Sequence, residues 1–142
     1  MSGFLVDTNV PSELVRSRPA SKVETWLTAQ NLDTLFISAV SFGELRKGTT
    51  LMSPGKRRTE LESWLEADLS SLFSGRILSV TRSIAERWGE LDARQQVAGR
   101  PLNIADGMIA ATALEHDLTV VTRNVKDFDL LGVTIFDPWE AT

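Results

Sequence analysis

The chain has 142 residues, and 15 Lys and Arg residues against 19 Asp and Glu residues give a net charge of −4. This length suits one domain with a core of its own, and a hydrophobic fraction of 42% excludes an intrinsically disordered chain. The absence of cysteine, together with a single histidine, His116, excludes disulfides, thiolate metal sites and histidine-rich zinc sites. Because no long apolar run and no signal peptide are found, we expect a cytoplasmic protein without a membrane segment.

The predicted elements alternate between short apolar strands and helices. In chain order we expect a strand at 3–6, a helix with Pro11 in its first turn and Thr8 or Asn9 as its cap, a helix over 20–30, a strand at 35–37 and a helix from Ser38 or Ser41 to about 51. After a break at 53–55, we expect a helix at 60–73, a strand at 77–80, a helix at 84–97, a helix at 103–116, a strand at 118–122, a helical turn at 124–131 and a strand at 133–136.

This alternation is typical of βαβ units and predicts an α/β fold. The strands are short apolar runs rather than alternations of polar and apolar residues, as expected when helices cover both faces of a parallel sheet. We therefore predict an α/β/α domain with a mainly parallel sheet of four or five strands. Ligands of such sheets bind at the carboxyl ends of the strands, so the residues that follow each strand are the first candidates for a site.

Two acids follow the first two strands. Asp7 ends the first strand, where an acid also serves as an ordinary turn or cap residue. Glu44 lies on the helix after the second strand, and Ser41-x-x-Glu44 has the spacing of a capping box. Glu44 also shares a helix face with Val40 and Leu51, so its carboxylate interrupts an apolar stripe. Both a structural and a functional role stay open for each acid.

Asp106 is the most informative acid of the sequence. It carries the one charge in the segment 104–114, whose apolar composition is typical of a buried helix. A buried carboxylate costs free energy unless it is paired or bound to a metal. Its place in the first turn after Asn103 also suits the helix dipole. A metal ligand and a helix-terminal acid are therefore both consistent with Asp106.

Asn124 and Asp127 follow the fourth predicted strand, where capping of a short helix accounts for both. Because a parallel sheet brings strand ends to one edge, Asp7, Glu44 and Asp106 are expected to gather there with Asn124. Three or four oxygen ligands, without cysteine or a well-placed histidine, favour Mg²⁺ or Mn²⁺. One or two such ions in an acidic cleft are typical of phosphodiester hydrolysis by a metal-activated water.

Other site types fit the sequence less well. The segment 43–49 has the glycine spacing of a phosphate loop, but it lacks the lysine after the second glycine and lies within a predicted helix. No G-x-G-x-x-G motif for a dinucleotide is present. His116 lies near a helix C-terminus, where a cation is favourable, and we do not expect it to act as a base. Arg46, Lys47 and Arg123 are candidate phosphate contacts, although solvated charges explain them as well.

Four motifs follow one another at characteristic spacing. They are Leu5-Val6-Asp7-Thr8-Asn9, Ser38-x-x-Ser41-x-x-Glu44-Leu45-Arg46-x-Gly48, Asp106-Gly107-Met108-Ile109-Ala110-Ala111-Thr112-Ala113 and Thr122-Arg123-Asn124-x-x-Asp127-Phe128. Together they resemble the motifs of the PIN-domain ribonucleases, and most of all those of the VapC- and FitB-like toxins of bacterial toxin–antitoxin pairs. The likeness covers essentially the whole chain, so we expect residues 1–142 to form a single PIN-like domain.

The resemblance implies a three-layer fold and Mg²⁺-dependent RNA cleavage, with metal binding by Asp7, Glu44 and Asp106. The family's fourth acid usually stands where this chain has Asn124. Since an amide brings no charge, the departure leaves open whether one or two metal ions bind, and whether Asp127, one turn away, takes the fourth position.

The remaining implications concern supporting residues and partners. Thr8, Asn9 and Thr122 belong to the same motifs and are expected to support the site. Arg46, Lys47 and Arg123 become candidate contacts for RNA phosphates. The resemblance also implies a homodimer and a small antitoxin that covers or enters the active site, and apolar positions of the early helices, such as Trp26 and Leu27, are candidates for these interfaces.

Two classes of function remain. The first is an endoribonuclease toxin that uses Mg²⁺, with Mn²⁺ as an alternative ion, and that an antitoxin neutralises. The second is a non-catalytic PIN-like module that binds RNA or an antitoxin. A phospho-acceptor receiver domain also combines Mg²⁺ with a parallel sheet, but it needs paired acids after the first strand and a lysine after the last. Here Asp7 is followed by Thr8 and Asn9, and residues 136–138 contain no lysine.

Overall fold

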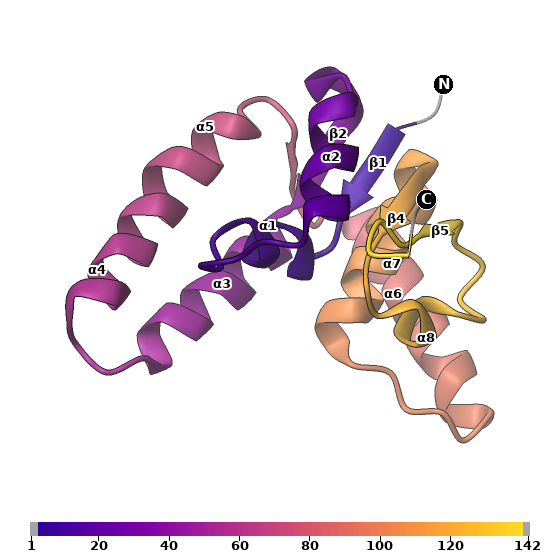
Figure 1. Ribbon diagram of the computed structural model, residues 1–142. Coiled ribbons are helices and arrows are strands. Elements are labelled where there is room, and N and C mark those ends of the chain that lie inside the picture. Colours follow the sequence, from indigo (N-terminus) through magenta and orange to yellow (C-terminus); the bar gives the residue numbers. More distant parts are fainter. Residues whose placement is uncertain (1–2, 141–142) are drawn as a thin grey trace.

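The computed structural model describes residues 3–140, and a five-stranded parallel sheet lies at its centre (Figure 1). The strands are β1 (Gly3–Val6), β2 (Leu35–Ser38), β3 (Ile77–Leu78), β4 (Leu118–Val121) and β5 (Ile135–Phe136), in the order β3-β2-β1-β4-β5. Each neighbouring pair is parallel. The predicted α/β fold with a parallel sheet is confirmed, and the central strand is the one that carries Asp7 at its end.

Helices connect the strands and cover both faces of the sheet. They are α1 (Asn9–Leu14), α2 (Ser21–Ala29), the 3₁₀ turn η1 (Leu32–Thr34), α3 (Ala39–Leu51), α4 (Lys56–Ser63), the π-helical turn η2 (Trp64–Leu69), α5 (Ser70–Leu72), α6 (Arg82–Val97), α7 (Ile104–His116) and α8 (Val125–Phe128). Helix α3 and the continuous run from α4 to α5 form an arm on the left of Figure 1. In the described part of the chain, no helix combines the length and apolarity that a membrane crossing requires.

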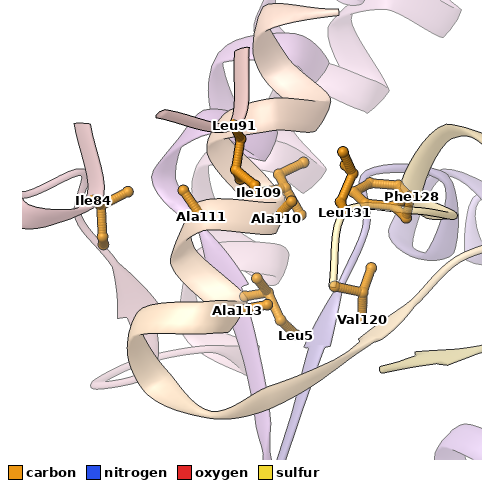
Figure 2. Close-up of a cluster of buried hydrophobic side chains, with 10 residues drawn as sticks. All are labelled: Leu5, Ile84, Leu91, Ile109, Ala110, Ala111, Ala113, Val120, Phe128 and Leu131. Carbon is orange, nitrogen blue, oxygen red and sulfur yellow. The ribbon is translucent and has the colours of Figure 1, made fainter. Parts of the chain in front are cut away.

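Two apolar clusters pack against opposite faces of the sheet. Figure 2 shows the first, in which Leu5 and Val120 of the central strands meet Ile109 of α7 and Phe128 of α8. The next residues along the same strands belong to the second cluster, together with buried residues of α1, α2, η2 and the end of α5. This switch between faces follows from the two-residue period of a strand. The structure therefore has the three layers that the sequence predicts.

The observed elements differ from the predicted ones mainly at their ends. The helix predicted at 60–73 begins at Lys56 and contains the π-helical turn η2. Strands β3 and β5 have two residues each, since as edge strands they pair on one side only. The indole of Trp26, a candidate for an interface, packs between Phe4 and Phe136 and covers the sheet, and it stays partly exposed.

Candidate active site

Asp7 lies at the carboxyl end of the central strand and is 4% exposed. Its backbone N–H donates to the carbonyl oxygen of Val121 at 2.8 Å, which extends the β1–β4 ladder to this residue. Its carboxylate accepts one hydrogen bond on each oxygen, from the Thr8 N–H at 2.8 Å and from the Thr122 hydroxyl at 2.8 Å. The sheet and two hydrogen bonds thus fix the direction of this acid.

Thr122 is fully buried beneath the site and binds three groups there. Its Oγ1 donates to Asp7 Oδ2 and accepts from Asn9 Nδ2 at 3.2 Å and from the Asn124 N–H at 3.0 Å. A hydroxyl has one proton and two lone pairs, so these three bonds use its full capacity. Thr122 therefore ties together the loops that follow β1 and β4.

Glu44 is placed by α3, which begins where β2 ends. Its Oε1 lies 2.6 Å from the hydroxyl oxygen of Thr8, which in turn lies 2.9 Å from the hydroxyl oxygen of Ser41. The helix is capped by Ser38, whose side chain accepts from the Val40 N–H at 3.0 Å. The capping box considered for Ser41 and Glu44 is therefore absent, and both side chains face Thr8 instead.

Asp106 lies in the first turn of α7, and its own carboxylate is not the cap of that helix. The cap is Asn103, whose side chain accepts from the Asp106 N–H at 3.2 Å. Gly107 follows, and a Cβ built there would lie 2.6 Å from Trp88 Cδ1 and 2.9 Å from Leu102 Cδ2. The glycine thus allows α6 to approach α7 closely next to Asp106.

A hollow of about 280 Å³, here called the acidic hollow, collects the candidate residues. It is lined by Asp7, Thr8, Asn9, Ser12, Glu44, Asp106 and Asn124. The four predicted catalytic residues are among them, as are Thr8 and Asn9. Ser12 was missed because a serine one helical turn after Thr8 carries no chemical signal in the sequence. Ser41 and Gly107 were also missed as parts of the site, because their effect depends on tertiary contacts.

The electrostatics of the acidic hollow oppose full ionisation of its acids. Burial raises the pKa of the Asp7 carboxyl, and repulsion by Glu44 and Asp127 adds to this, while the hydrogen bonds from Thr122 and Thr8 oppose it. Burial also raises the pKa of Asp106 to about 7, with further repulsion by Asp7, Asp127 and Glu44. A bound cation would offset this repulsion.

The donor set fits a hard cation. The residues that line the acidic hollow offer carboxylate, amide and hydroxyl oxygens and neither sulfur nor imidazole, as Mg²⁺ and Mn²⁺ prefer. Within residues 3–140, however, no three acidic or histidine side chains are already gathered closely enough to surround an ion.

Asn9 offers an additional oxygen at this place. Its Oδ1 is buried and has no hydrogen-bond partner in the part of the chain that the structure describes. The single proton of the Thr122 hydroxyl is directed at Asp7, so the amide must turn its Nδ2 toward Thr122 and leave Oδ1 unpaired. An unpaired buried oxygen costs free energy that a bound cation or its water would recover.

The other predicted residues lie around the acidic hollow rather than in it. Asp127 is exposed and lines a neighbouring hollow of about 260 Å³, which it shares with Asp106. Arg46 pairs with Glu66 at 2.9 Å on the arm. Lys47 lines a groove between α3 and α7 that also contains Glu44.

Arg123 was the third candidate for a phosphate contact. Its guanidinium stacks over the Trp139 ring, with 5.6 Å between the guanidinium carbon and the ring centroid. It does not line the acidic hollow.

Comparison with protein families matches residues 4–132 to the PIN domain. The chain belongs to the PIN-domain family. Among curated proteins, this PIN-domain chain is 38% identical to the VapC ribonuclease Y4jK of Sinorhizobium fredii, over 96% of this chain and 98% of that protein. It is also 38% identical to the toxin FitB of Neisseria gonorrhoeae, with the same coverage.

Among solved structures, the PIN-domain chain is similar to the crystal structure of FitAcB from Neisseria gonorrhoeae. The TM-score is 0.90 at 38% identity, over 97% of this chain and 99% of that chain. The likeness therefore extends over the sheet, the helices on both of its faces and the arm.

Proposed function

We propose that this PIN-domain protein is an endoribonuclease toxin that requires Mg²⁺ or Mn²⁺ and acts as a single domain over residues 1–142. The observation that carries the proposal is the acidic hollow, in which Asp7, Glu44 and Asp106 face one space at the carboxyl ends of the strands. The names of the two relatives, a ribonuclease and a toxin, support both parts of the proposal.

The three acids have distinct tasks in this reaction. Asp7 and Asp106 would hold the cation, and Glu44 would ligate it or position the attacking water. When bound, the ion supplies an activated water and neutralises charge on the scissile phosphate. Asn124 would offer an amide oxygen in place of a fourth carboxylate. Because the chain has no cysteine and its one histidine is His116, at the end of α7, it lacks the parts for side-chain acid–base cleavage of the ribonuclease A type.

The proposed partners follow from the toxin assignment. An RNA substrate and a cognate antitoxin both belong to the cytoplasm, where we expect the protein to act as a homodimer. An apolar hollow of about 400 Å³ between α1, α2 and α5, lined in part by Leu14, Leu27 and Phe73, offers a surface for a protein partner.

A non-catalytic binding module is the second candidate. The observation that favours it is Asn124, since an amide at the fourth position lowers the negative charge available for cations. The two candidates differ in one measurable property, because a binding module retains RNA or antitoxin binding and leaves RNA chains intact.

Incubation of the purified protein with total cellular RNA, with Mg²⁺ or with EDTA, tests the proposal. We expect Mg²⁺-dependent fragments that carry a 5′-phosphate and a 3′-hydroxyl. Asp106→Asn should abolish cleavage, whereas Asp68→Asn, which alters an exposed acid on η2, should cleave like the wild type. A 2′,3′-cyclic phosphate that forms equally well in EDTA would refute the mechanism, and intact RNA under every condition would support the binding module.

A further inference from the structure

Three oxygen-bearing side chains meet beside the acidic hollow at the ends of two neighbouring strands. Thr8 follows β1, and Ser41 and Glu44 lie near the start of α3, which follows β2. Thr8 Oγ1 lies 2.9 Å from Ser41 Oγ and 2.6 Å from Glu44 Oε1. Ser41 is fully buried, and Thr8 is the one hydrogen-bond partner of its side chain among residues 3–140.

The direction of these hydrogen bonds follows from the number of protons that each side chain can donate. An ionised Glu44 carboxylate only accepts, so the Thr8 hydroxyl donates its single proton to Glu44. That proton is then no longer available for Ser41, so the Ser41 hydroxyl donates to a lone pair of Thr8. The bonds run in one direction, from Ser41 through Thr8 to Glu44.

Helix capping does not account for either hydroxyl. Ser38 caps α3, and Ser41 lies inside that helix, one turn before Glu44 and on the same side. Thr8 is the N-cap residue of α1, yet its side chain makes no capping hydrogen bond there. Both hydroxyls are thus directed toward Glu44 rather than toward the ends of their own helices.

We propose that Ser41 is a positioning residue that acts through Thr8 to hold the Glu44 carboxylate toward Asp7 for cation binding. The inference rests on the proposed function, in which Glu44 serves the bound ion. An unrestrained Thr8 side chain has three staggered positions, and the bond from Ser41 favours the one that donates to Glu44. Ser41 is not among the residues that line the acidic hollow, so its effect must pass through Thr8.

The test measures the Mn²⁺ affinity of the full chain by electron paramagnetic resonance titration. Ser41→Ala removes one hydrogen bond, so we expect affinity about 2- to 10-fold weaker than that of the wild type. Thr49→Val is the matched control, because Thr49 is a buried residue on the same helix and its hydroxyl donates its single proton to the carbonyl oxygen of Arg46. This control should bind Mn²⁺ like the wild type, and excess Mn²⁺ should restore RNA cleavage by Ser41→Ala.

A double-mutant cycle shows whether Ser41 acts through Thr8. In a Thr8→Val background, Ser41→Ala should weaken Mn²⁺ binding no further, whereas Thr8→Ser keeps the hydroxyl and should retain both wild-type affinity and the dependence on Ser41. Additive losses, or equal losses in Ser41→Ala and Thr49→Val, would overturn the inference. If Ser41→Ala does not fold, the Mn²⁺ affinities of Thr8→Ser and Thr8→Val are compared instead. Equal affinities of these two variants would overturn the inference.

The same data separate this inference from the proposed function. A wild-type protein that neither binds Mn²⁺ nor cleaves RNA would overturn both. A wild-type protein that binds Mn²⁺ and cleaves RNA, while Ser41→Ala does so with equal affinity, would overturn the positioning role alone.

Discussion

The indole of Trp88 on α6 lies against Gly107 on α7 so closely that a methyl group on the glycine would be 2.6 Å from Trp88 Cδ1. Gly107 directly follows Asp106, so this contact sets the distance between the two helices at the acidic hollow. Leu102 closes the same space from the loop before α7. The glycine of the third motif is therefore required by packing, whereas in a free helix it would be unfavourable.

Gly107→Ala should destabilise the protein by about 1–3 kcal/mol, because the added methyl group overpacks the contact with Trp88. Denaturant unfolding followed by circular dichroism measures the change. Gly89→Ala is the matched control, since Gly89 lies in α6 and has nothing within 4 Å of a built Cβ. It should stabilise by about 0.5–1 kcal/mol, the usual gain from alanine in a helix. A Gly107→Ala protein of equal or greater stability would contradict the close-packing argument.

Thr122→Val should weaken Mn²⁺ binding and RNA cleavage by about 10- to 100-fold, the usual cost of losing a hydrogen bond that orients a metal ligand. The valine keeps the shape but leaves Asp7 Oδ2 and Asn9 Nδ2 without their common partner. Thr122→Ser retains the hydroxyl and should keep most of the affinity. Titration calorimetry with Mn²⁺ checks both variants, and equal affinities for valine and serine would show that the hydroxyl is dispensable.

Asp106→Asn should be more stable than the wild type at pH 8 in EDTA, with a smaller difference at pH 4. The folded-state pKa of Asp106 is raised from 3.8 to about 7, so the native state binds more protons than the unfolded state between these values. The wild type therefore loses stability as the pH rises through this window, and the amide variant avoids the loss. Urea unfolding at pH 4, 6 and 8 measures the difference in stability between the two proteins. A difference that does not change with pH would contradict the raised pKa of Asp106, which burial and then the neighbouring acids cause.

Asn124→Asp should bind Mn²⁺ more tightly, on the order of tenfold, because it adds a carboxylate to the ligand set. In EDTA the same variant should melt at a lower temperature, since a further negative charge joins Asp7, Glu44 and Asp106 in the acidic hollow. Thermal unfolding with and without Mn²⁺ tests both effects, because a ligand that binds the native state raises the melting temperature. A melting temperature unaffected by the substitution in EDTA and in Mn²⁺ alike would place residue 124 outside the electrostatic reach of the ion.

The sequence was sufficient to predict the class of fold, because strand and helix periods differ and short apolar strands indicate a parallel sheet. It did not predict the strand order, because alternation specifies which elements form and leaves open which strands become neighbours. The ends of β3 and β5 were also missed, since pairing on one side only shortens these edge strands.

For the candidate site, the gathering of Asp7, Glu44 and Asp106 in one hollow could be predicted from the strand-end rule and the motifs. The contact between Ser41 and Thr8 could not be predicted, because the spacing of Ser41 from Glu44 equals that of a capping box. A capping box and a contact with Thr8 are told apart only by the end of the neighbouring strand β1, which places Thr8 between Ser41 and Glu44. The packing role of Gly107 could not be predicted either, because the side chain that it contacts, Trp88, lies on another helix.

The hydrogen bond from Thr122 to Asp7 joins residues that are 115 positions apart. The chain is synthesised from its N-terminus, so Asp7 and Glu44 are made long before β4, the strand that precedes Thr122. Until β4 has been made, β1 lacks one of its two neighbouring strands in the sheet. Pairing between strands so far apart in the sequence is also slow to form. A nascent or truncated chain that lacks β4 thus carries acids without the hydroxyl that orients the first of them. The proposed site is therefore complete only when nearly the whole chain has been made.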